Sequence, residues 1–124
     1  SAIEGPLAAL AAALRAAAAS GCDAALTLPC DMPFAPEDMA ERLIGSLGPA
    51  GAAIAASGGR LHPVCGLWRV RCLEALPGYL AGGRRSLIGF AESVGFAAVE
   101  WKGDPFFNIN DASDLAEAER RLRS

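Results

Sequence analysis

The feature that most constrains the fold is a short apolar run that ends between two prolines. Residues 24–27 have the composition of a strand, and Leu28-Pro29-Cys30-Asp31-Met32-Pro33 follows directly. Prolines fix the backbone around Asp31 and remove competing N–H donors, because proline has a locked φ and no N–H group. In open α/β sheets, ligands bind at the carboxyl ends of the strands. The segment therefore predicts an α/β fold with a polar site at Asp31.

Patterns typical of strands and of helices alternate along the chain. Helices are expected at 7–19, 36–47, 71–80 and 86–94 and from Asp111 onward, and strands at 23–28, 52–56, 61–70 and 96–101. This alternation predicts a three-layer α/β sandwich. The strands at 52–56 and 61–70 flank a Ser-Gly-Gly turn, so they either pair as a hairpin or lie apart in the sheet. Because the chain is too short for two cores, we expect one domain over residues 1–124.

The composition argues against several classes of protein. The chain has 124 residues and a net charge of -3, which gives no electrostatic reason to expect nucleic acid or an anionic membrane as partner. It contains no run of about twenty apolar residues and no signal-peptide pattern. Its four cysteines form no C-x-x-C pair. We therefore expect reduced thiols in a cytoplasmic protein, with a zinc site or a disulfide framework as the alternative.

Asp31 has two possible roles. A surface aspartate commonly accepts a hydrogen bond from a nearby backbone N–H, and Asp31 would then be structural. The alternative is a Mg²⁺ ligand at the end of the strand, because Mg²⁺ takes one or two carboxylates and otherwise binds water and substrate phosphates. The residues alone leave both roles open.

Two further segments carry candidate ligand contacts. Gly5-Pro6 begins a helix, whose free N–H groups and dipole favour an anion or nucleotide. Asn108 and Asn110 lie two residues apart, so in an extended segment their carboxamides face the same side. They either form turns before a helix or contact a polar ligand or the waters of a metal.

The remaining candidates are His62, Arg84 and Arg85. His62 is the single histidine of the chain and precedes a rigid proline. Arg84 and Arg85 follow a Gly-Gly pair and either begin a solvated helix or bind a phosphate.

Taken in order, these motifs resemble those of the molybdenum cofactor guanylyltransferase family. The resemblance covers essentially the whole chain and rests on Gly5-Pro6-Leu7-Ala8, Pro29-Cys30-Asp31-Met32-Pro33, His62-Pro63-Val64 with Gly66-Leu67-Trp68, Arg84-Arg85 and Phe107-Asn108-Ile109-Asn110. The middle and final motifs are the more specific ones, whereas the helix-start motif is shared with other nucleotidyltransferases.

The resemblance implies a Rossmann-like fold of the nucleotide-diphospho-sugar transferase type. It also implies an enzyme that transfers GMP from Mg-GTP to the terminal phosphate of molybdopterin carrying molybdenum, with pyrophosphate as the second product. By the family's pattern, Asp31 would hold the Mg²⁺ on the GTP phosphates. Gly5 and Pro6 would lie beside the nucleotide, and Asn108 and Asn110 would approach the metal and the reacting phosphates.

The same resemblance places His62, Arg84 and Arg85 on the side of the pterin phosphate. The phosphate of molybdopterin would attack the α-phosphorus of GTP without a covalent enzyme intermediate. Positioning and charge neutralisation supply most of the catalysis in such transfers.

The chain departs from the family's pattern at two places. Ala9 stands where the family commonly has glycine, and residues 1–4 are too few to supply the family's first strand and Gly-rich phosphate loop. We therefore expect a C-terminal part of the enzyme that lacks its N-terminal strands and phosphate loop and has negligible activity alone. Unpaired strand edges and exposed apolar helix faces would favour self-association.

Two other functions remain open because the loop that selects the base is absent. One is a related transferase, either a CTP-dependent molybdopterin cytidylyltransferase or a sugar-phosphate nucleotidylyltransferase. The other is a non-catalytic α/β module that binds a partner protein, for which the missing phosphate loop is the main support.

Overall fold

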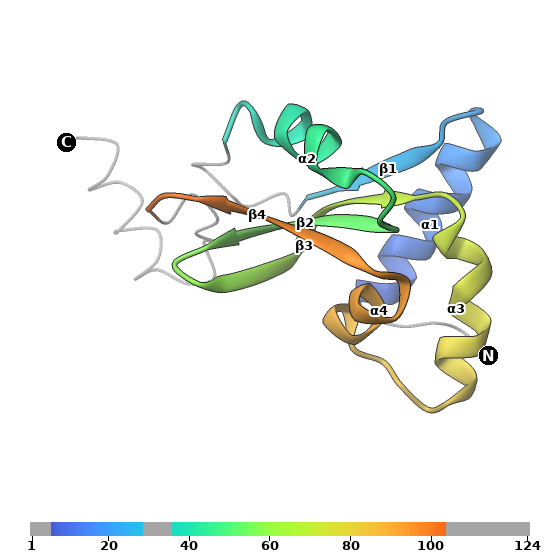
Figure 1. Ribbon diagram of the computed structural model, residues 1–124. Helices are drawn as coiled ribbons and strands as arrows, with labels where there is room; N and C mark the ends of the chain where they lie inside the picture. The colour runs from blue at the N-terminus through green and yellow to red at the C-terminus, as the bar shows by residue number, and fades with distance from the viewer. Residues whose placement is uncertain (1–5, 29–35, 104–124) are drawn as a thin grey trace, which may run out of the picture.

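The computed structural model describes residues 6–28 and 36–103 of the chain (Figure 1). The elements in this part are α1 (Pro6–Ala19), β1 (Ala24–Thr27), α2 (Met39–Leu47), β2 (Ala52–Ser57), β3 (Arg60–Arg69), α3 (Cys72–Ala81), α4 (Leu87–Val94) and β4 (Phe96–Trp101). The expected order of helices and strands is confirmed for these residues. Helix α2 begins three residues later than expected, after a turn in which the Met39 N–H donates to the Pro36 carbonyl. The helix expected from Asp111 lies outside the described residues.

The strands form one sheet in the order β1-β3-β2-β4. β3 runs antiparallel to β1 and β2, whereas β4 runs parallel to β2. β1, β2 and β4 therefore point the same way, and their last residues lie toward one edge of the sheet, which we call the carboxyl edge. The hairpin interpretation of β2 and β3 is confirmed. Gly58 and Gly59 form its two-residue turn with positive φ angles of 58° and 75°, as the right-handed twist of the strands requires.

β3 is irregular around Pro63. Its register with β2 shifts between the pairs Ile54↔Gly66 and Ala55↔His62, so the intervening residues of β3 bulge out of the ladder. Proline cannot donate a ladder hydrogen bond, and a bulge accommodates it. The bulge separates the part of β3 that pairs with β1 from the part that carries His62.

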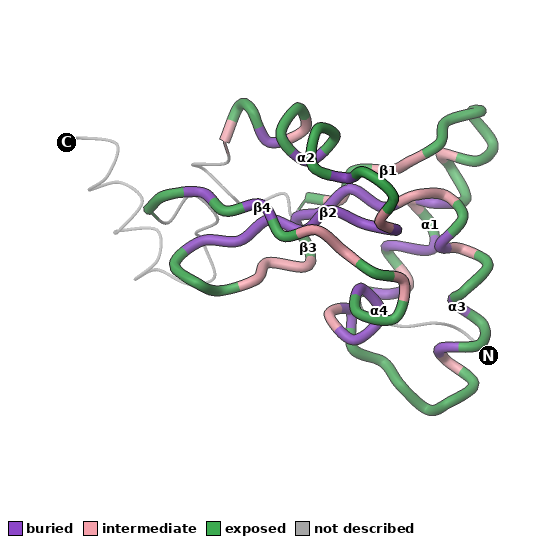
Figure 2. Tube along the Cα trace, in the orientation of Figure 1, coloured by how far each residue is buried: buried purple, intermediate pink, exposed green. Residues whose placement is uncertain are grey.

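Helices cover both faces of the sheet, which confirms the three-layer architecture. Figure 1 shows α2 on one face, with α1, α3 and α4 on the other. β2 is buried along its whole length (Figure 2). Its side chains alternate between the two cores. Ala52 and Ile54 belong to the core under α1, α3 and α4, whereas Ala53 and Ala55 belong to the core under α2.

Aromatic rings fill the core under α1, α3 and α4. The fully buried Trp68 ring stacks on Phe90 with centroids 5.9 Å apart, and Phe90 meets Tyr79 at 5.3 Å. Gly66 makes room for this arrangement, because a Cβ at Gly66 would lie 3.0 Å from the Trp68 Nε1 and 2.9 Å from the Ile54 Cδ1. The Gly-Leu-Trp motif is thus used in packing.

Within the described residues, no helix has the length and hydropathy needed to cross a membrane.

Candidate functional site

The carboxyl edge of the sheet is the candidate site. β1, β2 and β4 end at this edge, and the chain leaves β1 and β4 there toward the segments that carry Asp31 and the two asparagines. Gly5, Asp31, Asn108 and Asn110 lie outside the described residues, so their roles stay predictions. The described residues establish the parallel strand ends expected of a ligand site in an α/β sheet.

Pro6 begins α1 as expected and contributes to an apolar pocket of about 200 Å³. The pocket is lined by Pro6, Ala9, Leu10, Thr27, Val64, Trp68 and Leu87. The Thr27 hydroxyl donates to the Gly66 carbonyl at 3.2 Å and accepts from the Trp68 Nε1 at 3.3 Å. Because these polar groups are satisfied within the wall, the pocket suits an apolar group better than a charged one.

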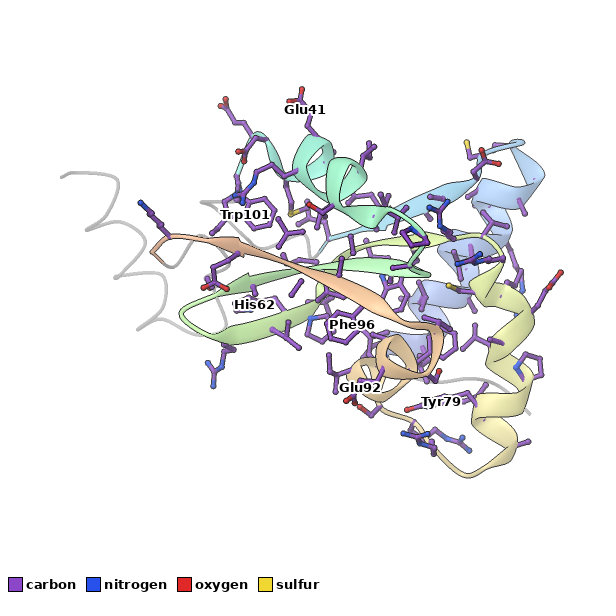
Figure 3. The ribbon with its side chains drawn as sticks, in the orientation of Figure 1. Glu41, His62, Tyr79, Glu92, Phe96 and Trp101 are labelled. Atoms are coloured by element: carbon purple, nitrogen blue, oxygen red, sulfur yellow. The ribbon has the colours of Figure 1, made fainter. Side chains whose placement is uncertain are left out.

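His62 lies half-buried near the β2–β3 turn (Figure 3). Its Nε2 is 2.9 Å from the Oγ of Ser57, the last residue of β2. His62 was predicted from the sequence as a site residue, whereas Ser57 was not. A signal was available, because Ser57 pairs with Arg60 across a tight hairpin, which makes Ser57 and His62 diagonal neighbours on one face.

Polar contacts also tie the end of β4 to its surroundings. The Gly59 N–H in the hairpin turn donates to the Glu100 carboxylate at 3.3 Å, and the Arg42 guanidinium of α2 donates to the Glu100 carbonyl at 2.8 Å. The same guanidinium lies 4.2 Å from the centre of a Trp101 ring, and the Trp101 Nε1 donates to Asp38 at 3.1 Å. The hairpin turn and the start of α2 are therefore both anchored to the carboxyl edge.

Arg84 and Arg85 lie in the exposed loop between α3 and α4. The Arg84 guanidinium is 4.8 Å from the centre of the Tyr79 ring, and Arg85 donates to the Leu80 carbonyl at 3.5 Å. Figure 3 places Tyr79 near α4 and far from His62. The described contacts therefore hold the arginines against α3, and they do not gather them with His62. Their predicted role in binding the pterin phosphate stays a prediction.

Of the described cysteines, Cys65 and Cys72 are buried in the core and Cys22 is exposed at the surface. Among the described residues, Cys22, Cys65 and Cys72 are free thiols. Burial raises the pKa of Cys65 to about 11 and also raises the pKa of Cys72, so both thiols are neutral near pH 7. No group of three or more His, Cys, Asp or Glu side chains is placed to hold a metal ion within residues 6–28 and 36–103. The Mg²⁺ site predicted at Asp31 falls outside these ranges.

Curated relatives match nearly the whole chain. A protein of Cereibacter sphaeroides named molybdenum cofactor guanylyltransferase is 46% identical over 121 residues, which is 97% of this chain and 62% of the relative. A protein of the same name from Acidiphilium cryptum is 46% identical over 94% of this chain and 58% of its own length. The chain thus spans about three-fifths of these relatives.

Solved structures and a family profile agree with the fold. The crystal structure of molybdopterin-guanine dinucleotide biosynthesis protein A from Archaeoglobus fulgidus superposes with a TM-score of 0.69 at 22% identity, covering 94% of this chain and 62% of that one. At this identity the likeness concerns the fold. The profile of the family described as MobA-like NTP transferase domain matches residues 1–94, which is well over half of the sequence. The chain therefore belongs to the MobA-like NTP transferase family.

Proposed function

We propose that the complete protein transfers GMP from Mg-GTP to molybdopterin carrying molybdenum and releases pyrophosphate. The observation that carries this proposal is the carboxyl edge, where the parallel strands β1 and β4 end and lead toward Asp31 and toward Asn108 and Asn110. The names of relatives at 46% identity support the same reaction. The cytoplasmic location expected from the sequence stays a prediction.

The chemistry is a displacement at the α-phosphorus of GTP. An oxygen of the molybdopterin phosphate forms the new bond to this phosphorus, and the bond to the β-phosphate oxygen breaks, so that pyrophosphate leaves with its electron pair. A bound Mg²⁺ would neutralise the negative charge of the triphosphate. Asp31 is proposed as its protein ligand, with Asn108 and Asn110 directed at the reacting phosphates.

Replacing Asp31 tests the proposal in the complete protein. We expect Asp31→Asn to lower GMP transfer by on the order of 100-fold or more, because the metal loses a carboxylate where charge has to be neutralised. GMP transfer is measured as formation of the guanine dinucleotide, and Mg²⁺-dependent GTP binding is measured by calorimetry.

Glu37→Gln is the matched control. Glu37 is an exposed carboxylate shortly after the same loop, so its loss should leave transfer unchanged. Unchanged Mg²⁺-dependent nucleotide binding by the Asp31 variant would refute the site. Transfer from CTP at least as fast as from GTP would favour the cytidylyltransferase alternative.

The isolated 124-residue chain is expected to lack turnover and to self-associate. In the described part, β1 pairs through one edge with β3, and Leu26 beside the other edge is 42% exposed. A strand edge with an exposed apolar side chain favours pairing with another chain. Light scattering at micromolar concentrations checks this expectation, and a monomer throughout would contradict it.

A further inference from the structure

We propose that Ser57 is a positioning residue that fixes the imidazole of His62 at the carboxyl edge. The contribution of Ser57 to turnover rests on the proposed function, whereas its effect on the orientation of the His62 ring does not. Sequence patterns gave Ser57 no role beyond its place in a turn.

The burial of Ser57 is the first argument. Its side chain is 6% exposed, and it is the single buried residue of polar or charged type in the part of the chain that the structure describes. Burying a hydroxyl without a partner is unfavourable, and the partner here is the Nε2 of His62 at 2.9 Å. The buried hydroxyl of Ser57 is therefore engaged with the histidine.

The backbone around His62 is the second argument. Pro63 follows His62 and restricts its backbone dihedral angles, because the proline ring crowds the preceding residue. The register shift next to Pro63 then separates His62 from the regular ladder further along β3. With the backbone restricted in this way, the bond to Ser57 constrains the torsions of the imidazole ring.

The depth of Ser57 is the third argument. The hydroxyl is too buried to meet a ligand directly, whereas His62 is half-buried near the turn. Ser57 therefore acts through His62. The hairpin does not depend on this bond alone, because the strand ladder and the bond from Gly59 to Glu100 also hold the turn. A variant at Ser57 should keep the fold.

The decisive measurement is the nitrogen NMR spectrum of the His62 imidazole in the complete protein, where the resonances of His62 are assigned by their loss in His62→Ala. Ser57→Ala should shift the Nε2 resonance of His62 and broaden its ring signals. Ser57→Cys nearly keeps the side-chain volume but hydrogen-bonds weakly, so it should act in the same direction and separates loss of the bond from loss of packing. Ser93→Ala, which removes a hydroxyl bonded to the Phe90 carbonyl on α4, should leave the imidazole spectrum unchanged.

The second measurement is a double-mutant cycle on GMP transfer in the complete protein. Ser57→Ala should lower kcat/KM by about 2- to 10-fold, the effect of one hydrogen bond. It should have no further effect in a His62→Ala background, because Ser57 acts through the ring. A purely structural role predicts the same loss in both backgrounds.

An imidazole spectrum that is unchanged in both Ser57 variants would overturn the proposal. An undiminished effect of Ser57→Ala without His62 would overturn its functional part. Failure of the complete protein to transfer GMP at all would count against the proposed function, and the NMR comparison would still decide the orientation of His62.

Discussion

The two faces of the sheet are covered in different ways. In the part of the chain that the structure describes, three helices cover one face, and its core contains the stacked rings of Trp68 and Phe90 with Tyr79 beside them. Among the same residues, α2 covers the other face with Leu43 and its neighbours, and polar contacts link the start of α2 to the end of β4. Figure 2 shows β2, which is buried along its whole length, between the two layers.

The two faces therefore have different roles. One contributes mainly to the stability of the fold, and the other also positions residues near the candidate site. Apolar packing closes the face under α1, α3 and α4, whereas the face under α2 combines a smaller core with Arg42 and Asp38 near the carboxyl edge. We therefore expect the largest single effect on the free energy of unfolding from removal of a buried aromatic ring on the first face.

The largest expected effect is that of Trp68→Ala. Trp68 is fully buried and also donates to Thr27, so its removal leaves a large cavity and an unpaired hydroxyl acceptor. We expect a loss of about 3–5 kcal/mol in the free energy of unfolding, measured by urea denaturation followed by circular dichroism. Ile44→Ala, at a side chain that is 62% exposed, is the control and should change stability by less than about 0.5 kcal/mol. A loss below about 1 kcal/mol for Trp68→Ala would contradict the expectation that the aromatic core under α1, α3 and α4 dominates the stability of the fold.

A matched pair of leucines compares the faces directly. Leu14 of α1 and Leu43 of α2 are both 0% exposed and belong to opposite cores. Each change to alanine should cost about 2–5 kcal/mol. We expect one cooperative transition with the same denaturant dependence in both variants, because β2 contributes to both cores. Two separate transitions in Leu43→Ala would show that the α2 layer unfolds independently.

The smallest effect concerns the thiol of Cys65 in the core under α2. Burial raises its pKa from 9.0 to about 11, so the folded state keeps a proton that the unfolded state loses first. The stability from this group is present below pH 9 and is lost as the pH rises toward 11, by on the order of 1 kcal/mol per pH unit. The free energy of unfolding measured across this window should show the slope.

The slope should become shallower in Cys65→Ala, whatever the stability of this variant at neutral pH, and the raised pKa of Cys72 accounts for part of the slope that remains. Cys22→Ala, at an exposed thiol, should retain the full slope. An equal slope in Cys65→Ala and the wild type would assign the pH dependence to another group.

Local pattern was sufficient for most elements of the described fold. Residues 98–101 alternate in burial as a strand, and Ser86 caps α4 by accepting from the Gly89 N–H. Helix α2 was expected to begin at Pro36 because proline and acidic residues favour a first turn, yet the chain first makes a separate turn there. Proline and acidic residues are favoured both in such turns and in the first turn of a helix, so the sequence did not distinguish the two.

The candidate site was less accessible to sequence reasoning. His62 was identified by its rarity and its proline neighbour, but its partner Ser57 follows from strand pairing. The grouping of His62 with Arg84 and Arg85 followed from the resemblance. In the described structure, Arg84 lies over the Tyr79 ring, a contact that requires α3 and α4 to pack together.

The sequence by itself determined the alternation of helices and strands, the tight Gly-Gly turn and the family, because periodicity, turn chemistry and motifs are local properties of the chain. Tertiary structure decided the strand order β1-β3-β2-β4, the antiparallel insertion of β3 and the contact between Ser57 and His62. These features depend on which distant segments pair and pack, and the free energy of pairing is set by burial on both faces of the sheet rather than by neighbouring residues.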